Sequence, residues 1–436
     1  MTGAGADYAD VVARSRERRN RSPLHALRHR TLAIYTAGNF LSNTGTWFQS
    51  IASVIVADRL SDGNTIVVGA VVFSQFAAVV LLAPWTGRAA DRFDRKRMLL
   101  LVQGAAAVAS LILAGLEGAG LVTLPVLIGM TLVLGITTAF TVPGLKALVP
   151  TLVPPDLTGD AISLDSVTFN LARAIGPVLG AAVYGAFGAA WSFGLNALSY
   201  LALIVALLVI RPTPNPRTAG RATLRSAVGL LRGQPMLIAS LVVVAAVSVS
   251  SDPAATLGPA LSRSFGHPST TAGWLLGAFG AGAVIAGFTL SPGRQHPGRR
   301  MVILCSVMAG ATLVVAVAPG LGLALPALAL AGFGYLASQT QATTALQLGV
   351  GESQRGRIMA LWSVAFVGTK PLAALIDGAL ASLVGARAAT ALMALPVAGA
   401  ALWVLAAMRK VDAQAALERR RAGGDSAVVA PSPVRG

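Results

Sequence analysis

Charged residues are scarce in this sequence. Lysine, arginine, aspartate and glutamate make up only 12% of the 436 residues, whereas hydrophobic residues make up 55%. The mean hydropathy is +0.70. A soluble globular chain carries about 25% charged residues, so this composition excludes that class. We therefore expect an integral membrane protein.

Cysteine and histidine are also rare. Cys305 is the single cysteine, so no disulfide can form within the chain, and the four histidines fall in tails and expected loops. The sequence has no Gly-Lys-Ser or Gly-Lys-Thr loop to hold a nucleotide phosphate. We therefore expect no metal site, no cofactor, no direct use of ATP and no enzymatic activity.

Long hydrophobic runs fill most of the chain. A helix of about 20 apolar residues crosses the roughly 30 Å hydrocarbon core of a membrane. The runs are continuous rather than alternating, which favours helices over a barrel and predicts an all-α membrane protein. Twelve spans are predicted, at residues 32–57, 66–87, 98–117, 121–143, 163–187, 189–210, 236–262, 270–291, 301–318, 321–348, 357–383 and 387–408.

Basic residues outnumber acidic residues by 34 to 17. On the span map nearly all of them fall on one side, and Arg59, Arg263 and Arg387 fall on the other. Positively charged connections between membrane spans stay in the cytoplasm, so the excess of basic residues is explained by membrane topology. We therefore expect no nucleic-acid partner. The first 30 residues lack the apolar core of a cleavable signal. This pattern predicts a multi-pass protein of the bacterial inner membrane with both termini in the cytoplasm.

The longest polar interruption divides the predicted spans six and six. Weak self-similarity between residues 155–162 and 351–358, at matching places in the two halves, indicates an old duplication. The expected organisation is a basic cytoplasmic tail over 1–30, a six-helix bundle over 31–210, a cytoplasmic linker over 211–235, a second six-helix bundle over 236–408 and a disordered tail over 409–436.

The connection after the second predicted span carries Gly87, Asp91, Arg92 and Arg95. This spacing resembles the loop motif of the major facilitator superfamily, except that Asp94 replaces its second glycine. Asp-Arg-Phe-Asp-Arg-Lys is typical of the branch that contains the enterobactin exporter and macrolide efflux proteins. The resemblance covers residues 31–410 and implies two pseudo-symmetric six-helix bundles.

In that superfamily the loop latches the two bundles in one conformation. The resemblance therefore implies a gating role for Gly87, Asp91, Arg92 and Arg95, with Asp94 left open. Asp91 suits such a role because a carboxylate beside a helix N-terminus can accept amide hydrogen bonds and pair with an arginine. The alternative is that the loop acts only as a topology signal.

Four ionisable residues stand out inside predicted spans, where a charge costs about 2.5–3.5 kcal/mol or more. Asp252 and Asp377 are candidates for proton coupling, and Arg173 and Lys370 are candidates for charge pairing. Asp165, near the inner end of the fifth span, is expected to be solvated.

Asp252 precedes Pro253 and is followed by Gly258 and Pro259, so the seventh span is expected to be bent or broken. The alternative role for Asp252 is to cap the helix that restarts at the proline. Both roles stay open.

Uncharged polar residues within spans should avoid lipid, because a hydroxyl or amide there has no partner. Those that we expect to line a substrate cavity are Asn39, Asn43, Thr46, Thr138, Gln339 and Thr343. Gly176, Pro177 and Gly180 resemble a truncated antiporter motif, which favours export.

These features predict a monomeric secondary transporter in the lipid bilayer. It exports an amphipathic small molecule, such as a drug, siderophore or secondary metabolite, by proton antiport with alternating access. The alternatives are an uptake permease or uniporter, and a membrane scaffold or sensor that does not transport.

Overall fold

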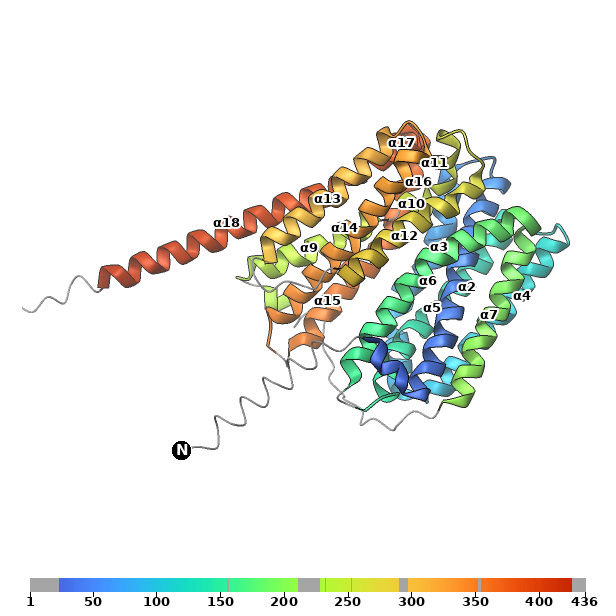
Figure 1. The fold of residues 1–436 in the computed structure, drawn as a ribbon, viewed down its shortest axis with the longest axis horizontal. Coiled ribbons are helices and arrows are strands. Elements are labelled where there is room, and N and C mark those ends of the chain that lie inside the picture. Colours follow the sequence, from blue (N-terminus) through green and yellow to red (C-terminus); the bar gives the residue numbers. More distant parts are fainter. Residues whose placement is uncertain are drawn as a thin grey trace, which may run out of the picture. The chain divides into compact units, whose positions relative to one another are not determined.

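The structure is a computed structural model that describes residues 23–154, 157–210, 228–231, 233–251, 253–289, 297–351 and 354–425. All regular secondary structure in these ranges is helical (Figure 1). The predicted all-α class is therefore confirmed. The chain forms two compact units: unit 1 takes the described residues of 1–53 and 77–218, and unit 2 takes those of 54–76 and 219–436.

Unit 1 is built from helices whose ends follow local sequence signals. Pro125 lies in the first turn of α5, where its missing N–H costs no hydrogen bond, and Gly188 ends α6 with a φ of 86°. Leu32, Tyr35 and Leu203 belong to its buried core. Its helices are α2 (Arg30–Leu60) up to Ser53, α3 (Thr65–Arg92) from Ala77, α4 (Arg95–Gly118), α5 (Leu124–Leu148), α6 (Thr158–Phe187) and α7 (Ala189–Val209), with the 3-10 helices η1 (Pro23–Arg28) and η2 (Val149–Thr151).

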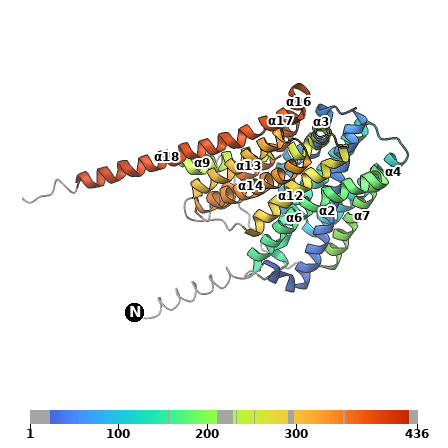
Figure 2. The same cartoon turned by 45° about the horizontal axis from the view of Figure 1, so that its top comes forward.

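Unit 2 packs around α14 (Leu321–Leu348), which contacts both α12 (Ala272–Thr289) and α13 (Pro297–Val317). Its core includes Val243, Leu275 and Met308. Helix α18 runs beside α13 and continues past it (Figures 1 and 2). Its helices are η4 (Gly229–Leu231), α9 (Pro235–Ser250), α10 (Pro253–Thr256), α11 (Gly258–Ser264), η5 (Ser269–Thr271), α12 (Ala272–Thr289), α13 (Pro297–Val317), α14 (Leu321–Leu348), α15 (Arg355–Val367), α16 (Lys370–Val384), α17 (Ala386–Leu392) and α18 (Ala394–Asp425).

The end of α2 and the start of α3 belong to unit 2, although they come early in the sequence. Thr65 donates a hydrogen bond from its Oγ1 to the carbonyl oxygen of Gly378, at 2.8 Å. A β-carbon on Gly69 would lie only 2.6 Å from the carbonyl oxygen of Ala374, so glycine permits this close approach of α3 and α16. The segment 54–76 is therefore packed closely against α16 in unit 2.

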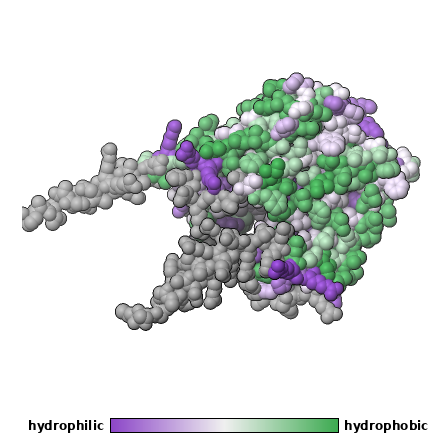
Figure 3. Space-filling model, in the orientation of Figure 1, coloured by the Kyte–Doolittle hydropathy of each residue, from purple (hydrophilic) through white to green (hydrophobic). Residues whose placement is uncertain are grey.

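Ten helical segments in the described part of the chain are long and apolar enough to cross a membrane. Many of their large hydrophobic side chains are exposed, among them Leu101, Val317 and Leu383. Figure 3 shows a mainly hydrophobic surface over the described helices on this face. Such a surface suits contact with lipid.

The ten segments do not include two of the predicted spans. Helix α2 occupies the first span, but its many Asn, Ser and Thr residues lower its hydropathy. In the seventh span, α9 has only 16 residues. The predicted break in this span is confirmed, because separate helices begin at Pro253 and Gly258.

Two other stretches differ from the sequence expectation. The eleventh predicted span consists of α15 and α16, which meet at Gly368 and Thr369, just before Pro371. The expected disordered tail from residue 409 is helical up to Asp425, because α18 continues through a stretch rich in the strong helix formers Ala and Arg.

Candidate functional site

Two helices of unit 1 place polar and aromatic side chains at matching intervals. Asn39, Asn43 and Trp47 follow one another every four residues along α2, and Asp165, Phe169 and Arg173 do so along α6. Residues four apart share one face of a helix. We call these six residues the α2/α6 seam, because contacts between the two sets join the helices.

A carboxylate lies at one end of the seam. Asn39 donates from Nδ2 to Asp165 Oδ1 at 3.0 Å, and the Tyr35 hydroxyl donates to the same oxygen at 3.3 Å. Asn43 donates from Nδ2 to Asn39 Oδ1 at 2.9 Å, which fixes the orientation of the Asn39 amide. The expectation that Asp165 is simply solvated was wrong: the residue is half-buried and accepts hydrogen bonds from α2.

Aromatic rings and a guanidinium form the rest of the seam. The rings of Trp47 and Phe169 meet edge to face, with centroids 6.1 Å apart. The buried Arg173 guanidinium lies 5.2 Å from the Trp47 ring centroid, within the range of a cation–π contact. Arg173, predicted as a charge-pair candidate, is thus held against an aromatic face inside unit 1.

Glycines bring α2 and α6 close together beyond the seam. A β-carbon on Gly176 would lie 2.7 Å from Trp47 Cβ, and one on Gly180 would lie 2.6 Å from the carbonyl oxygen of Phe48. Pro177 lies between them, inside α6. Gly176 and Gly180 therefore lie where the two helices pack closely, as small residues in membrane helices often do.

The other expected cavity residues do not join the seam. Thr46 donates to the Ser42 carbonyl oxygen at 2.9 Å and lies 3.5 Å from the Tyr200 hydroxyl of α7. Thr138 donates to the Leu134 carbonyl oxygen within its own helix, at 2.9 Å.

In unit 2, Thr343 accepts a hydrogen bond from Trp362 Nε1 at 2.9 Å. Its own hydroxyl donates to the carbonyl oxygen of Gln339 at 2.7 Å. This pair links α14 to α15 and places an indole ring beside the two expected cavity residues.

The loop motif spans the end of α3 and the start of α4. Gly87, Asp91 and Arg92 lie in the last turns of α3, and the side chains of Asp91 and Arg92 fall outside the described part of the structure. Arg95 donates from Nη1 to the Ala147 carbonyl oxygen at 3.3 Å. Asp94 accepts from the Arg97 backbone N–H at 2.8 Å and caps α4. Capping accounts for an aspartate at that position.

Lys370 and Asp377 are both buried in unit 2. The Lys370 ammonium lies 5.4 Å from the Phe76 ring centroid and 5.3 Å from that of Phe366. Asp377 lies two helical turns further along α16 and is fully buried. Asp252, the other coupling candidate, lies outside the described residues.

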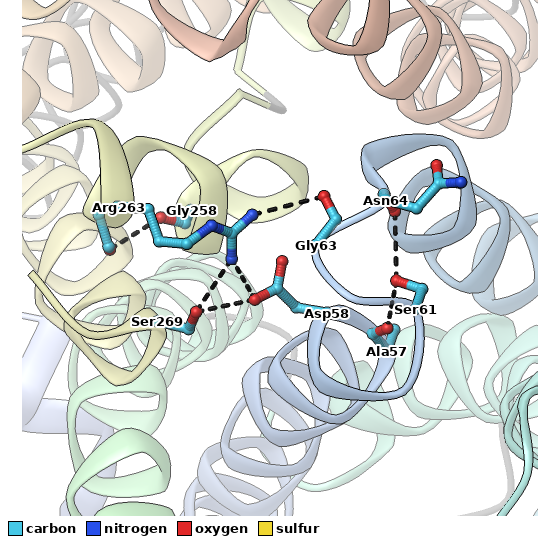
Figure 4. Close-up of polar contacts among 9 residues, drawn as sticks. Ala57, Asp58, Ser61, Gly63, Asn64, Gly258, Arg263 and Ser269 are labelled. Atoms are coloured by element: carbon cyan, nitrogen blue, oxygen red, sulfur yellow. Dashed lines mark hydrogen bonds and ion pairs between the residues drawn. The ribbon is translucent and has the colours of Figure 1, made fainter.

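Sequence reasoning missed a charge cluster in unit 2. Arg263 of α11 pairs with Asp58 of α2 and donates to Ser269 Oγ at 3.1 Å, and Ser269 donates to Asp58 Oδ2 at 2.7 Å (Figure 4). Arg263 also reaches the carbonyl oxygen of Gly63, in the left-handed turn after α2, at 3.4 Å. The available signal was an acidic residue directly after the first predicted span, which ends at residue 57.

The described residues contain no group of three or more His, Cys, Asp or Glu side chains placed to hold a metal ion. Polar groups that the described residues do bring together include the seam and a buried hydrogen-bonded cluster of Gln49, Ser110 and Asn196 in unit 1, and the charge cluster of unit 2. Their chemistry is that of hydrogen bonding and charge pairing.

Comparison with known proteins gives consistent matches along the chain. A family model described as transmembrane secretion effector matches residues 21–429. The enterobactin exporter EntS of Citrobacter koseri is 28% identical over 310 residues, covering 68% of this chain and 72% of the relative. The EntS of Shigella boydii is 27% identical over 307 residues, with the same coverage.

Solved structures share the fold at low sequence identity. A bacterial homolog of the human lysosomal transporter Spinster, inward-facing and occupied, has a TM-score of 0.69 and 14% identity, covering 89% of this chain and 98% of its own. The nucleoside transporter NupG has a TM-score of 0.68 and 14% identity, covering 86% of this chain and 99% of its own.

Proposed function

The chain belongs to the transmembrane secretion effector family, within the major facilitator superfamily, and on that premise we propose that it exports an amphipathic small molecule by proton antiport. The relatives named as enterobactin exporters support export and make siderophores, drugs and secondary metabolites the substrate classes to test.

The α2/α6 seam is the observation that carries the proposal. It holds a carboxylate, two amides and a guanidinium between two helices of a strongly apolar chain. Polar groups in a membrane are costly and mark substrate or ion pathways. A membrane scaffold or sensor could have leucine at these positions without loss, so the seam favours a transporter.

We further propose that twelve helices form two six-helix bundles that alternate access to a site near the membrane midplane, with both termini in the cytoplasm and one chain as the working unit. The fold shared with solved transporters of this superfamily supports the arrangement. Within it, Gly87, Asp91, Arg92 and Arg95 are proposed to latch one of the two conformations.

Proton coupling is proposed at Asp377 and Asp252. The complete burial of Asp377 supports this role. Burial makes the charged form of a carboxylate costly, so the binding or release of a proton there strongly changes the energy of the protein. Coupling requires that the two access states bind the proton with different affinities, because a ligand with equal affinity for both states shifts nothing.

Accumulation of candidate compounds by everted membrane vesicles tests the proposal. An antiporter loses accumulation when an uncoupler collapses the proton gradient, whereas a uniporter keeps its rate. An uptake permease accumulates nothing in that orientation, and a scaffold transports nothing in any orientation.

A further inference from the structure

The carboxylate of Asp165 has one oxygen occupied and one available. Tyr35 and Asn39 both donate to Oδ1. In the described part of the chain, Oδ2 of Asp165 receives no hydrogen bond, and the residue is half-buried. Because Oδ2 is not engaged by a side chain of the described residues, it is available to the positive group of a ligand.

Neighbouring groups orient this carboxylate. The Tyr35 hydroxyl and the Asn39 amide donate to it, and these hydrogen bonds offset part of the cost of burying its charge. Asn43 fixes the Asn39 amide from the other side. The site therefore offers a carboxylate in a fixed orientation on the surface of α6.

Aromatic surface follows directly along the same face. Phe169 is one turn beyond Asp165, about 6 Å along α6, and 41% of its surface is exposed. Trp47 is half-buried and touches the edge of Phe169. A ligand whose positive group binds Asp165 could therefore pack its apolar or aromatic body against these two rings. The faces of the rings also attract cations.

The far end of the seam limits the charge of the ligand. Arg173 lies two turns beyond Asp165, about 12 Å along α6, and its guanidinium is buried against Trp47. A second positive group on the ligand would meet this cation and be repelled. The seam is therefore negative at one end, aromatic in the middle and positive at the other end.

We propose that Asp165 is the subsite for the positive group of a singly charged organic cation whose apolar body lies on Phe169 and Trp47. This inference rests on the proposed exporter function and narrows its substrate class. Nothing in the comparisons assigns a cation site to this chain.

One neighbouring charge gives the proposal a second consequence. Lys146 of α5 is close enough to interact electrostatically with Asp165 and partly offsets its charge. At alkaline pH, where Asp165 stays ionised without Lys146, replacement of this exposed lysine by glutamine should strengthen cation binding, whereas loss of the Asp165 charge should weaken it. The two substitutions have opposite expected signs.

The test is equilibrium binding to the purified full-length protein. Tetraphenylphosphonium and tetraphenylborate are the probes, since they have the same shape and opposite charge. Asp165→Asn should weaken tetraphenylphosphonium binding about tenfold or more and leave tetraphenylborate binding unchanged or tighter. Asp160→Asn removes the same charge from the first turn of α6 and serves as the matched control, with little effect expected on either probe.

Two results would overturn the proposal. The first is tetraphenylphosphonium binding that Asp165→Asn leaves intact; if the same variant loses proton-driven transport, Asp165 is a proton site instead. The second is an equal loss for both probes, which indicates a structural role.

Lys146→Gln keeps the test decisive if Asp165→Asn does not fold, because a lysine on the exposed surface tolerates replacement. Tighter tetraphenylphosphonium binding at alkaline pH supports the subsite, and unchanged or weaker binding there contradicts it. Because the assay measures binding, wild-type vesicles that export nothing would refute the exporter proposal without deciding whether Asp165 binds cations.

Discussion

Arg263 and Asp58 form an ion pair although 205 residues separate them in the sequence. The pair fixes the end of α2 to α11 within unit 2 (Figure 4). The two partners differ in exposure: 40% of the Arg263 side chain is accessible but only 6% of the Asp58 side chain. Loss of Arg263 therefore leaves a buried carboxylate, whereas loss of Asp58 leaves an arginine that water can solvate.

This asymmetry predicts unequal effects on stability. Arg263→Ala should lower the stability of the purified protein by about 1–3 kcal/mol, the cost of leaving a buried polar group short of a partner. Asp58→Asn should cost less, because Ser269 can still donate to the retained side-chain oxygen. The unfolding midpoint of each variant is measured by heating the purified protein and monitoring the fraction that stays folded by size-exclusion chromatography.

The double variant completes a thermodynamic cycle. Asp58→Asn combined with Arg263→Ala should be more stable than Arg263→Ala alone, since no uncompensated buried charge remains. Additive losses would show that the two side chains do not interact in the folded protein.

Helix packing in unit 1 predicts opposite signs for two glycine substitutions in α6. Gly180→Ala should lower the unfolding midpoint, because its β-carbon would lie 2.6 Å from the carbonyl oxygen of Phe48. Gly185→Ala places its β-carbon in open space and should be neutral or stabilising by up to about 1 kcal/mol, the helix propensity difference. Equal midpoints for the two variants would contradict the close approach of α2 and α6.

Substitutions of Asp91 and Asp94, in and beside the loop motif, should have different effects: one on the rate of transport and the other on stability. Asp91→Asn should slow transport in vesicles while insertion and thermal stability stay at wild-type levels, as expected of a latch that acts between conformations. Asp94→Ala should instead lower stability by about 0.5–2 kcal/mol through loss of the α4 cap, and Asp94→Ser should restore it. Normal transport rates in Asp91→Asn would leave the loop with a topological role only.

The sequence was informative where the pattern is local. Continuous apolar runs predicted the helical class. Pro253 and Pro259 predicted the break in the seventh span, because a proline lacks a backbone N–H and interrupts a helix whatever that helix packs against. The extension of α18 to Asp425 was not predicted, because hydropathy falls after residue 408 while helix propensity stays high. The split between α15 and α16 was not predicted either, because the apolar run continues through Gly368 and Thr369, where the helix breaks.

Contacts between distant helices could not be derived in the same way. Asp165 and Asn39 are 126 residues apart, and their pairing depends on the relative register of α2 and α6, which no local pattern specifies. The same holds for the grouping of residues 54–76 with unit 2. Individual residue types were nevertheless useful, because Asn39, Asn43 and Arg173 were selected from the sequence as polar groups within apolar spans.

The most direct test of antiport is accumulation of a transported compound in everted vesicles, with and without an uncoupler, for the wild type and for Asp377→Asn and Asp252→Asn. We predict proton-driven accumulation that the uncoupler abolishes in the wild type, and accumulation that is already lost in a variant of the coupling residue. Accumulation that persists in the presence of the uncoupler would contradict proton antiport.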